Sequence, residues 1–109
     1  MAVRFVRATG LPENPLDAAT DFYSRILPAI REDLEQVGEI VVGFEPAGHD
    51  HYAWRLAAIR DLAREVAPCR VNGVVVPATD PVGCAETLNY LNGAPGITGQ
   101  LLAVGSTGN

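Results

Sequence analysis

The residues best suited to chemistry gather in one short stretch, His49-Asp50-His51, with Glu45 just before it and Tyr52 directly after it. Imidazoles and carboxylates serve proteins as general acids, general bases and metal ligands. At the start of a helix the two histidines would point in different directions, and no third ligand stands at a matching spacing. We therefore expect no metal here, and a solvated loop that caps the next helix is the simpler interpretation.

The absence of lysine removes several chemistries, since all eight basic residues of the 109 are arginine. A Schiff base on the protein, a Walker-type phosphate loop and a lysine general base all require an ammonium group. No histidine stands at a spacing that would define a partner for Cys69 or Cys84. We expect both cysteines to be small core residues with reduced thiols.

Charge and hydropathy narrow the possible partners further. The formal net charge is -5, and the arginines are interleaved with acidic residues. Nucleic acids and anionic membrane surfaces are bound mainly by clustered cations, so neither is an expected partner. No apolar run approaches the ~20 residues that a membrane span needs, and the first ten residues are too weakly apolar for a signal peptide. These features predict a cytoplasmic protein.

Strand and helix patterns alternate along the chain. Apolar runs rich in β-branched residues predict buried strands, and cap residues followed by three- and four-residue apolar spacing predict helices. The predicted strands are 2–8, 39–44, 70–76 and 100–104, and the predicted helices are 15–37, 50–67 and 81–91. This alternation predicts a parallel sheet with right-handed crossovers in a single domain, residues 1–105, followed by a loose tail, residues 106–109.

The first predicted helix starts at Asn14-Pro15 and carries one apolar stripe, and Pro28 inside it should bend it. The members of the stripe are Leu16, Ala19, Tyr23, Ile26, Ile30, Leu34 and Val37.

The second predicted helix is apolar around more than one stripe. The side expected to face the sheet carries Tyr52, Leu56, Ile59 and Val66. Trp54, Ala57 and Ala58 point elsewhere. They either pack against the first helix or form a subunit interface together with it, and the two arrangements are compatible.

From about Phe22 onward the chain resembles the C-terminal half of a short-chain dehydrogenase/reductase. The matching segments, in family order, are FYSRILPAIREDLEQVGEIVVGF, RLAAIRDLAREVAPCRVNGVVVPA and YLNGAPGITGQLLAV. The resemblance implies a truncated Rossmann-like domain with four parallel strands in sequential order, two long helices on one face and a short helix on the other. It also implies an uncovered sheet face and a free strand edge, both of which favour association.

The chain departs from the family where the family does its chemistry. The place of the catalytic serine holds Phe44 and Glu45. The catalytic tyrosine and lysine stand four residues apart in the family, and placing Tyr52 in the tyrosine role puts Leu56 at the lysine place. No glycine-rich dinucleotide turn is present. We expect no catalytic residue and no bound cofactor.

Two hypotheses for function follow. In the first, the chain is a non-catalytic interaction subunit that self-associates or joins a full-length dehydrogenase. Its candidate interface residues are Val3, Phe5, Trp54, Ala57 and Ala58. In the second, it is a small ligand-binding protein, or an enzyme related to oxidoreductases, whose pocket at the carboxyl ends of the strands is completed by a second chain. The candidate pocket residues are Glu45, His49, His51, Tyr52, Thr79 and Asp80.

Overall fold

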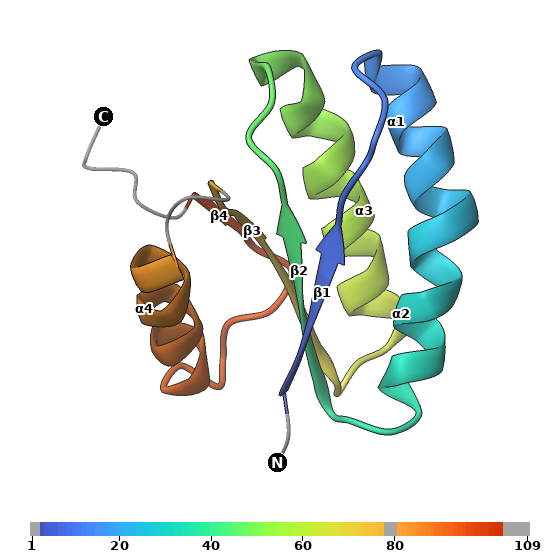
Figure 1. The fold of residues 1–109 in the computed structure, drawn as a ribbon. Coiled ribbons are helices and arrows are strands. Elements are labelled where there is room, and N and C mark those ends of the chain that lie inside the picture. The colour runs from blue at the N-terminus through green and yellow to red at the C-terminus, as the bar shows by residue number, and fades with distance from the viewer. Residues whose placement is uncertain (1–2, 78–80, 104–109) are drawn as a thin grey trace.

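The computed structural model describes residues 3–77 and 81–103, and these form one four-stranded parallel sheet with helices packed against it (Figure 1). The strand order is that of the chain, and β1 pairs in register with β2 from Val3 opposite Glu39 to Ala8 opposite Phe44. The strands are β1 (Val3–Ala8), β2 (Glu39–Phe44), β3 (Arg70–Val75) and β4 (Leu101–Ala103). The predicted α/β Rossmann-like arrangement is confirmed. The predicted loose tail, residues 106–109, lies outside the described residues.

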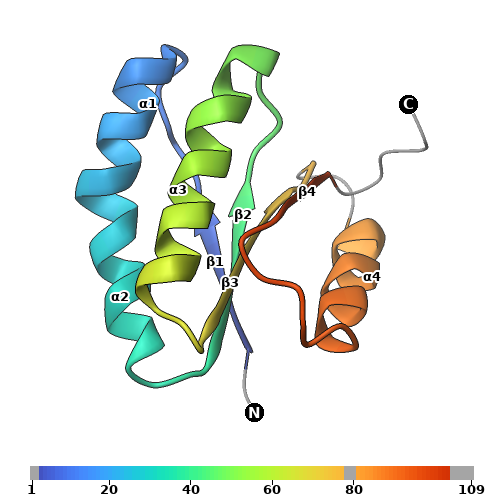
Figure 2. The same ribbon diagram turned by 180° about the vertical axis from the view of Figure 1, so that it is seen from behind.

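Helices cover the two faces of the sheet unequally (Figures 1 and 2). One face is covered by a long helix made of α1 (Pro15–Asp21), a π-helical turn (Phe22–Ile26) and α2 (Leu27–Leu34), and by α3 (Tyr52–Glu65) beside it. The other face has α4 (Pro81–Asn92), which lies on the side of β3 and β4, away from β1. Among the described residues, no helix is long and apolar enough to cross a lipid bilayer.

Asn14 caps the first helix as its position before Pro15 predicts. Its side-chain oxygen accepts hydrogen bonds from the main-chain N–H groups of Leu16, at 2.9 Å, and Asp17, at 3.1 Å. Proline at the first helical position needs no hydrogen bond of its own.

The chain accommodates Pro28 by widening the helix one turn earlier. In a regular α-helix the proline ring would meet the carbonyl group four residues before it. Here the preceding turn is π-helical, and the N–H of Leu27 donates to the carbonyl of Phe22, five residues back. A π turn holds one more residue than an α turn, and proline is one of the usual causes of such irregularities.

The π turn changes which residues of the first helix face the core. Up to the start of this turn the core-facing positions are displaced by one from the predicted apolar stripe, so Ala18 and Phe22 face the core in place of Ala19 and Tyr23. Leu16 and Tyr23 are instead 81% and 43% exposed. The period of 3.6 residues holds on each side of the π turn but not across it.

The second helix also differs from its expected orientation. Tyr52 is 49% exposed and does not face the sheet, whereas Ile59 is fully buried. The Trp54 ring packs between the first helix and β2, with its centroid 5.6 Å from that of Phe22. Ala58 is 1% exposed and belongs to the same core. Of the two arrangements considered, the structure therefore shows Trp54 and Ala58 packed within the chain.

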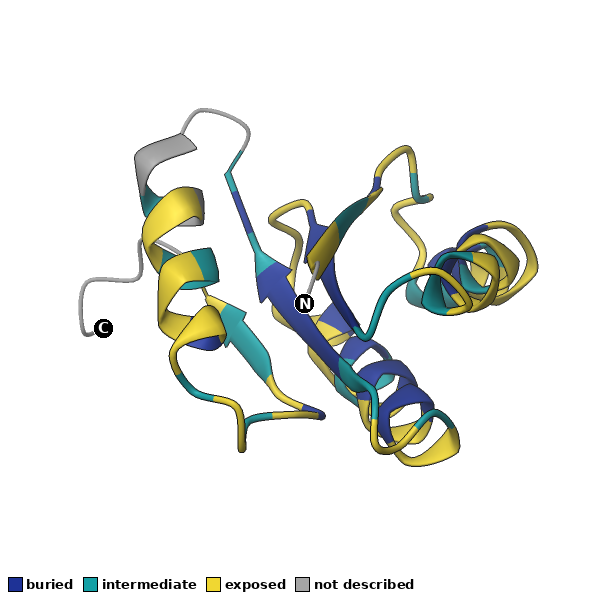
Figure 3. Ribbon diagram, turned by 90° about the horizontal axis from the view of Figure 1, so that it is seen from below, coloured by how far each residue is buried: buried dark blue, intermediate teal, exposed yellow. Residues whose placement is uncertain are grey.

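Burial is complete at the centre of the sheet and incomplete at β1 (Figure 3). All six residues of β2 are buried, which confirms that its unbroken apolar run is covered on both faces. In the part of the chain that the structure describes, β1 has a strand neighbour on one side only. Val3 on this strand is 43% exposed.

Candidate functional site

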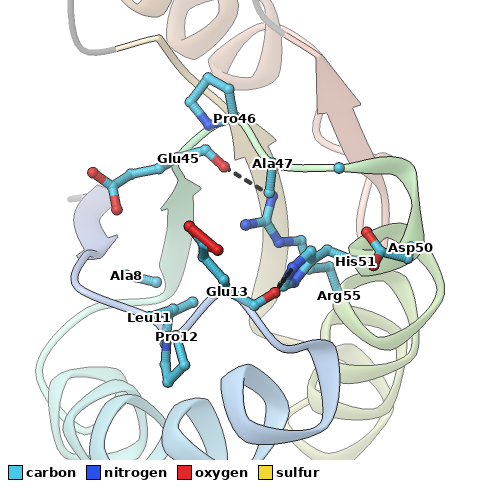
Figure 4. A pocket seen from close by; sticks show the side chains of 11 residues that line it. Ala8, Leu11, Pro12, Glu13, Glu45, Pro46, Ala47, Asp50, His51 and Arg55 are labelled. Atoms are coloured by element: carbon cyan, nitrogen blue, oxygen red, sulfur yellow. Dashed lines mark hydrogen bonds between the residues drawn. The ribbon is translucent and has the colours of Figure 1, made fainter.

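A cavity of about 400 Å³ lies at the carboxyl ends of β1 and β2 (Figure 4). Open parallel sheets usually bind ligands outside the carboxyl ends of their strands, because the loops there diverge. Three segments build the cavity: the loop after β1, the loop after β2 and the first turn of α3. Its lining residues are Ala8, Leu11, Pro12, Glu13, Glu45, Pro46, Ala47, Gly48, Asp50, His51 and Arg55.

Arg55 contributes the positive charge of this cavity, and the sequence patterns did not single it out as a site residue. It is only 6% exposed, and its Nη1 donates a hydrogen bond of 2.9 Å to the main-chain carbonyl of Glu45. The guanidinium carbon lies 4.7 Å from the centre of the Phe44 ring and 5.8 Å from that of Trp54. These rings attract the cation and hold it at the cavity wall.

The charge of Arg55 has no ion-pair partner in the part of the chain that the structure describes. Within residues 3–77 and 81–103, no carboxylate forms a salt bridge with this guanidinium, and its buried Nε has no hydrogen-bond partner. Burial lowers the pKa of Arg55, and the nearby negative charge of Glu45 opposes that change. An arginine stays protonated in a protein, so the site holds a cation with unused capacity to donate.

His51 is a structural residue, because both of its ring nitrogens are occupied. The indole N–H of Trp54 can only donate, so the His51 Nδ1 at 3.1 Å must accept. The hydrogen therefore resides on Nε2, which donates to the carbonyl of Glu13 at 2.8 Å. His51 is 6% exposed and ties the start of α3 to the loop before α1. His51 also lines both cavities at this end of the sheet, although its ring nitrogens are engaged within the chain.

The other predicted pocket residues are distributed around two cavities. His49 and Tyr52 stack at 6.1 Å with nearly parallel rings, and both line a second cavity of about 230 Å³. The Glu45 carboxylate accepts a long hydrogen bond of 3.4 Å from the N–H of Gly10. Thr79 and Asp80 lie outside the described residues.

A second arginine, the partly buried Arg70, stabilises the fold. Its guanidinium pairs with Glu39 at 2.7 Å and donates to the main-chain carbonyls of Leu91, Ala94 and Ile97. These bonds fasten the end of α4 and the following loop to the sheet. Both terminal nitrogens of the Arg70 guanidinium thus donate hydrogen bonds, whereas among the described residues Arg55 donates one, from its Nη1.

No metal centre is indicated in the described ranges 3–77 and 81–103. They contain no group of three or more histidine, cysteine, aspartate or glutamate side chains that could hold an ion.

Comparison with known proteins gives one match. A family model described as "Short chain dehydrogenase-like protein" matches residues 6–104. The match runs from within β1 to just beyond β4 and so includes every element that frames the cavity. Searches of the curated proteins and of the solved structures each gave no match.

Proposed function

Because the chain belongs to the family of short chain dehydrogenase-like proteins, we propose that it acts as a non-catalytic association module that pairs with a second copy of itself. The observation that carries this proposal is the edge of β1 that no other described strand pairs with, together with the side of β1 that faces away from α1 and α3. We call this surface the β1 flank and define it by Val3, Phe5 and Arg7.

The β1 flank is only partly covered by the described part of the chain. Parallel sheets are normally covered on both faces, and an unpaired edge strand readily pairs with another chain. Val3 is 43% exposed, and the partly buried Phe5 ring lies directly over Gly43 of β2, where a Cβ atom would overlap it. The Arg7 guanidinium lies 5.1 Å from the centre of the Phe5 ring. An apolar surface with one arginine at its margin suits burial against a second chain.

Two copies related by a two-fold axis can join their sheets through antiparallel β1 strands. In the register that places Phe5 opposite Phe5 of the second copy, Arg4 stands opposite Val6 and Arg7 opposite Val3. No arginine then faces an arginine, so the pairing avoids like-charge repulsion.

The residues at the positions of the family's catalytic tyrosine and lysine argue against hydride transfer by this chain. In the family that the sequence resembles, a lysine four residues after the catalytic tyrosine binds the nicotinamide ribose and lowers the tyrosine pKa. This chain has no lysine, and Leu56 stands four residues after Tyr52. Arg55, the cation next to that position, is held by the Glu45 carbonyl and by two aromatic rings.

Sedimentation velocity over a range of concentrations tests the association. We expect a dimer whose dissociation constant rises about tenfold or more in Val3→Arg, because the new guanidinium would stand opposite Arg7 of the second copy and two cations would face each other. Leu16→Arg is the matched control, since Leu16 is 81% exposed on α1. Dissociation by Leu16→Arg but not by Val3→Arg would place the interface on the helices and overturn the proposal.

A titration with NADH and NADPH tests the non-catalytic part. We expect no saturable change in nucleotide fluorescence when the protein is added. Saturable binding, or reduction of a carbonyl compound by the bound nucleotide, would contradict it.

A further inference from the structure

The Arg55 cavity presents one cation and several carboxylates to any molecule that enters it. Arg55 is more than nine-tenths buried, and its charge has no ion-pair partner among the described residues. A buried cation without an anion is costly, so an anionic group that reached the guanidinium would be stabilised strongly. The free donors of Arg55 therefore point to a ligand with a negative group.

The rest of the lining makes a simple anion a poor occupant. Glu13 and Glu45 come from the two loops that frame the cavity, and in Figure 4 the Glu13 side chain extends toward the space between Glu45 and Arg55. Their carboxylates would repel an anion and attract an ammonium group. The main-chain carbonyl of Glu13 accepts a hydrogen bond from His51 and that of Glu45 accepts one from Arg55, so both loops are anchored beside the cavity.

We propose that this cavity binds a small zwitterion, with its anionic group on the Arg55 guanidinium and its ammonium group between the Glu13 and Glu45 carboxylates. The cavity volume of about 400 Å³ is within the range for small-molecule sites. This site goes beyond the proposed association, because its polar groups lie on α3 and on the loops at the strand ends and not on the β1 flank.

The test uses ω-amino acids from glycine to 5-aminopentanoate as probes, with the carboxylate and the amine of matched chain length as controls. Trp54 is the single tryptophan of the chain and lies 5.8 Å from the Arg55 guanidinium, so its fluorescence reports occupancy. We expect at least one ω-amino acid to bind saturably with a dissociation constant below about 10 mM. Its matched carboxylate and amine should each bind at least about tenfold more weakly.

Variants that keep the fold then test the assigned contacts. Glu13→Gln and Glu45→Gln change exposed side chains, and each should weaken the ω-amino acid about tenfold. Both should leave binding of the matched carboxylate unchanged or tighter. Glu35→Gln removes an exposed carboxylate that does not line the cavity and should change neither affinity.

Three results would overturn the proposal. The first is the absence of saturable binding by every ω-amino acid in the series. The second is equal affinity for the matched carboxylate, which would make the cavity a simple anion site. The third is tighter ω-amino acid binding by Glu13→Gln, which would identify Glu13 as a competitor for Arg55. Circular dichroism of each variant confirms that the fold is intact.

Discussion

Replacing His51 with leucine tests whether this histidine is structural. The change removes the hydrogen bond to the Glu13 carbonyl at 2.8 Å and the one from Trp54 at 3.1 Å. Each such bond contributes about 1 kcal/mol of net stability, so we expect the free energy of unfolding to fall by about 2 kcal/mol. Urea denaturation followed by far-UV circular dichroism measures the change.

Two conservative variants and a double-mutant cycle separate the two bonds. Asparagine in place of His51 offers an acceptor near Nδ1, and glutamine offers a donor near Nε2. Each should cost about half as much as leucine, near 1 kcal/mol. Combining His51→Leu with Trp54→Phe should reveal a coupling energy of about 1 kcal/mol between the two side chains.

A coupling energy near zero would show that the Trp54 N–H does not donate to Nδ1, and the assigned tautomer would be wrong. If His51→Leu left stability unchanged, the histidine would be free for chemistry, contrary to its place in the structure.

Three further predictions concern the stability of the fold. Arg70→Met leaves the buried Glu39 carboxylate without its partner, so chemical denaturation should show that the free energy of unfolding falls by about 3 kcal/mol or more. Combining Arg70→Met with Glu39→Gln should restore part of this free energy. Gly73→Ala places a methyl group 3.0 to 3.2 Å from side chains of α3, β2 and β4, so it should lower the free energy of unfolding by about 1–3 kcal/mol in thermal unfolding. Gly96 has open space around it, so Gly96→Ala should leave this free energy nearly unchanged. The pKa of Glu65 is lowered by its hydrogen bond to the arginine of α2, so its contribution to stability is present above the ordinary glutamate pKa of about 4.3 and is lost as the pH falls through the lowered value. Wild type should therefore lose more stability on acidification than Glu65→Gln, and equal losses would contradict the assignment.

The sheet could be predicted from the sequence because its signals are local. The β-branched runs of β2 and β3 are typical of strands that are buried on both faces. Because strands alternate with helices along the chain, the pattern predicts a parallel sheet. The start of α1 at Asn14-Pro15 could be predicted equally well, because the cap and the proline act within one helical turn.

The π turn and the Arg55 site could not be predicted from the sequence patterns. Pro28 indicates an irregular helix but not whether the helix bends or widens, and the burial of Arg55 depends on contacts with the end of β2 and the segment that follows it. The apolar residues around Phe22 and Tyr23 are compatible with two stripes, and the widened turn before Pro28 selects the one that contains Phe22. A lone arginine on a helix is typical of a solvated surface. Only the approach of the Glu45 carbonyl and the Phe44 ring makes Arg55 a buried cation.

Hydrogen exchange at two protein concentrations tests the central claim most directly. If the β1 flank is covered by a second copy, the main-chain amides of residues 3–8 should exchange more slowly at high concentration than at low concentration. The amides of α1 should exchange at the same rate in both samples. Exchange in β1 that does not depend on concentration, or protection that appears on α1 and α3 instead, would contradict the account.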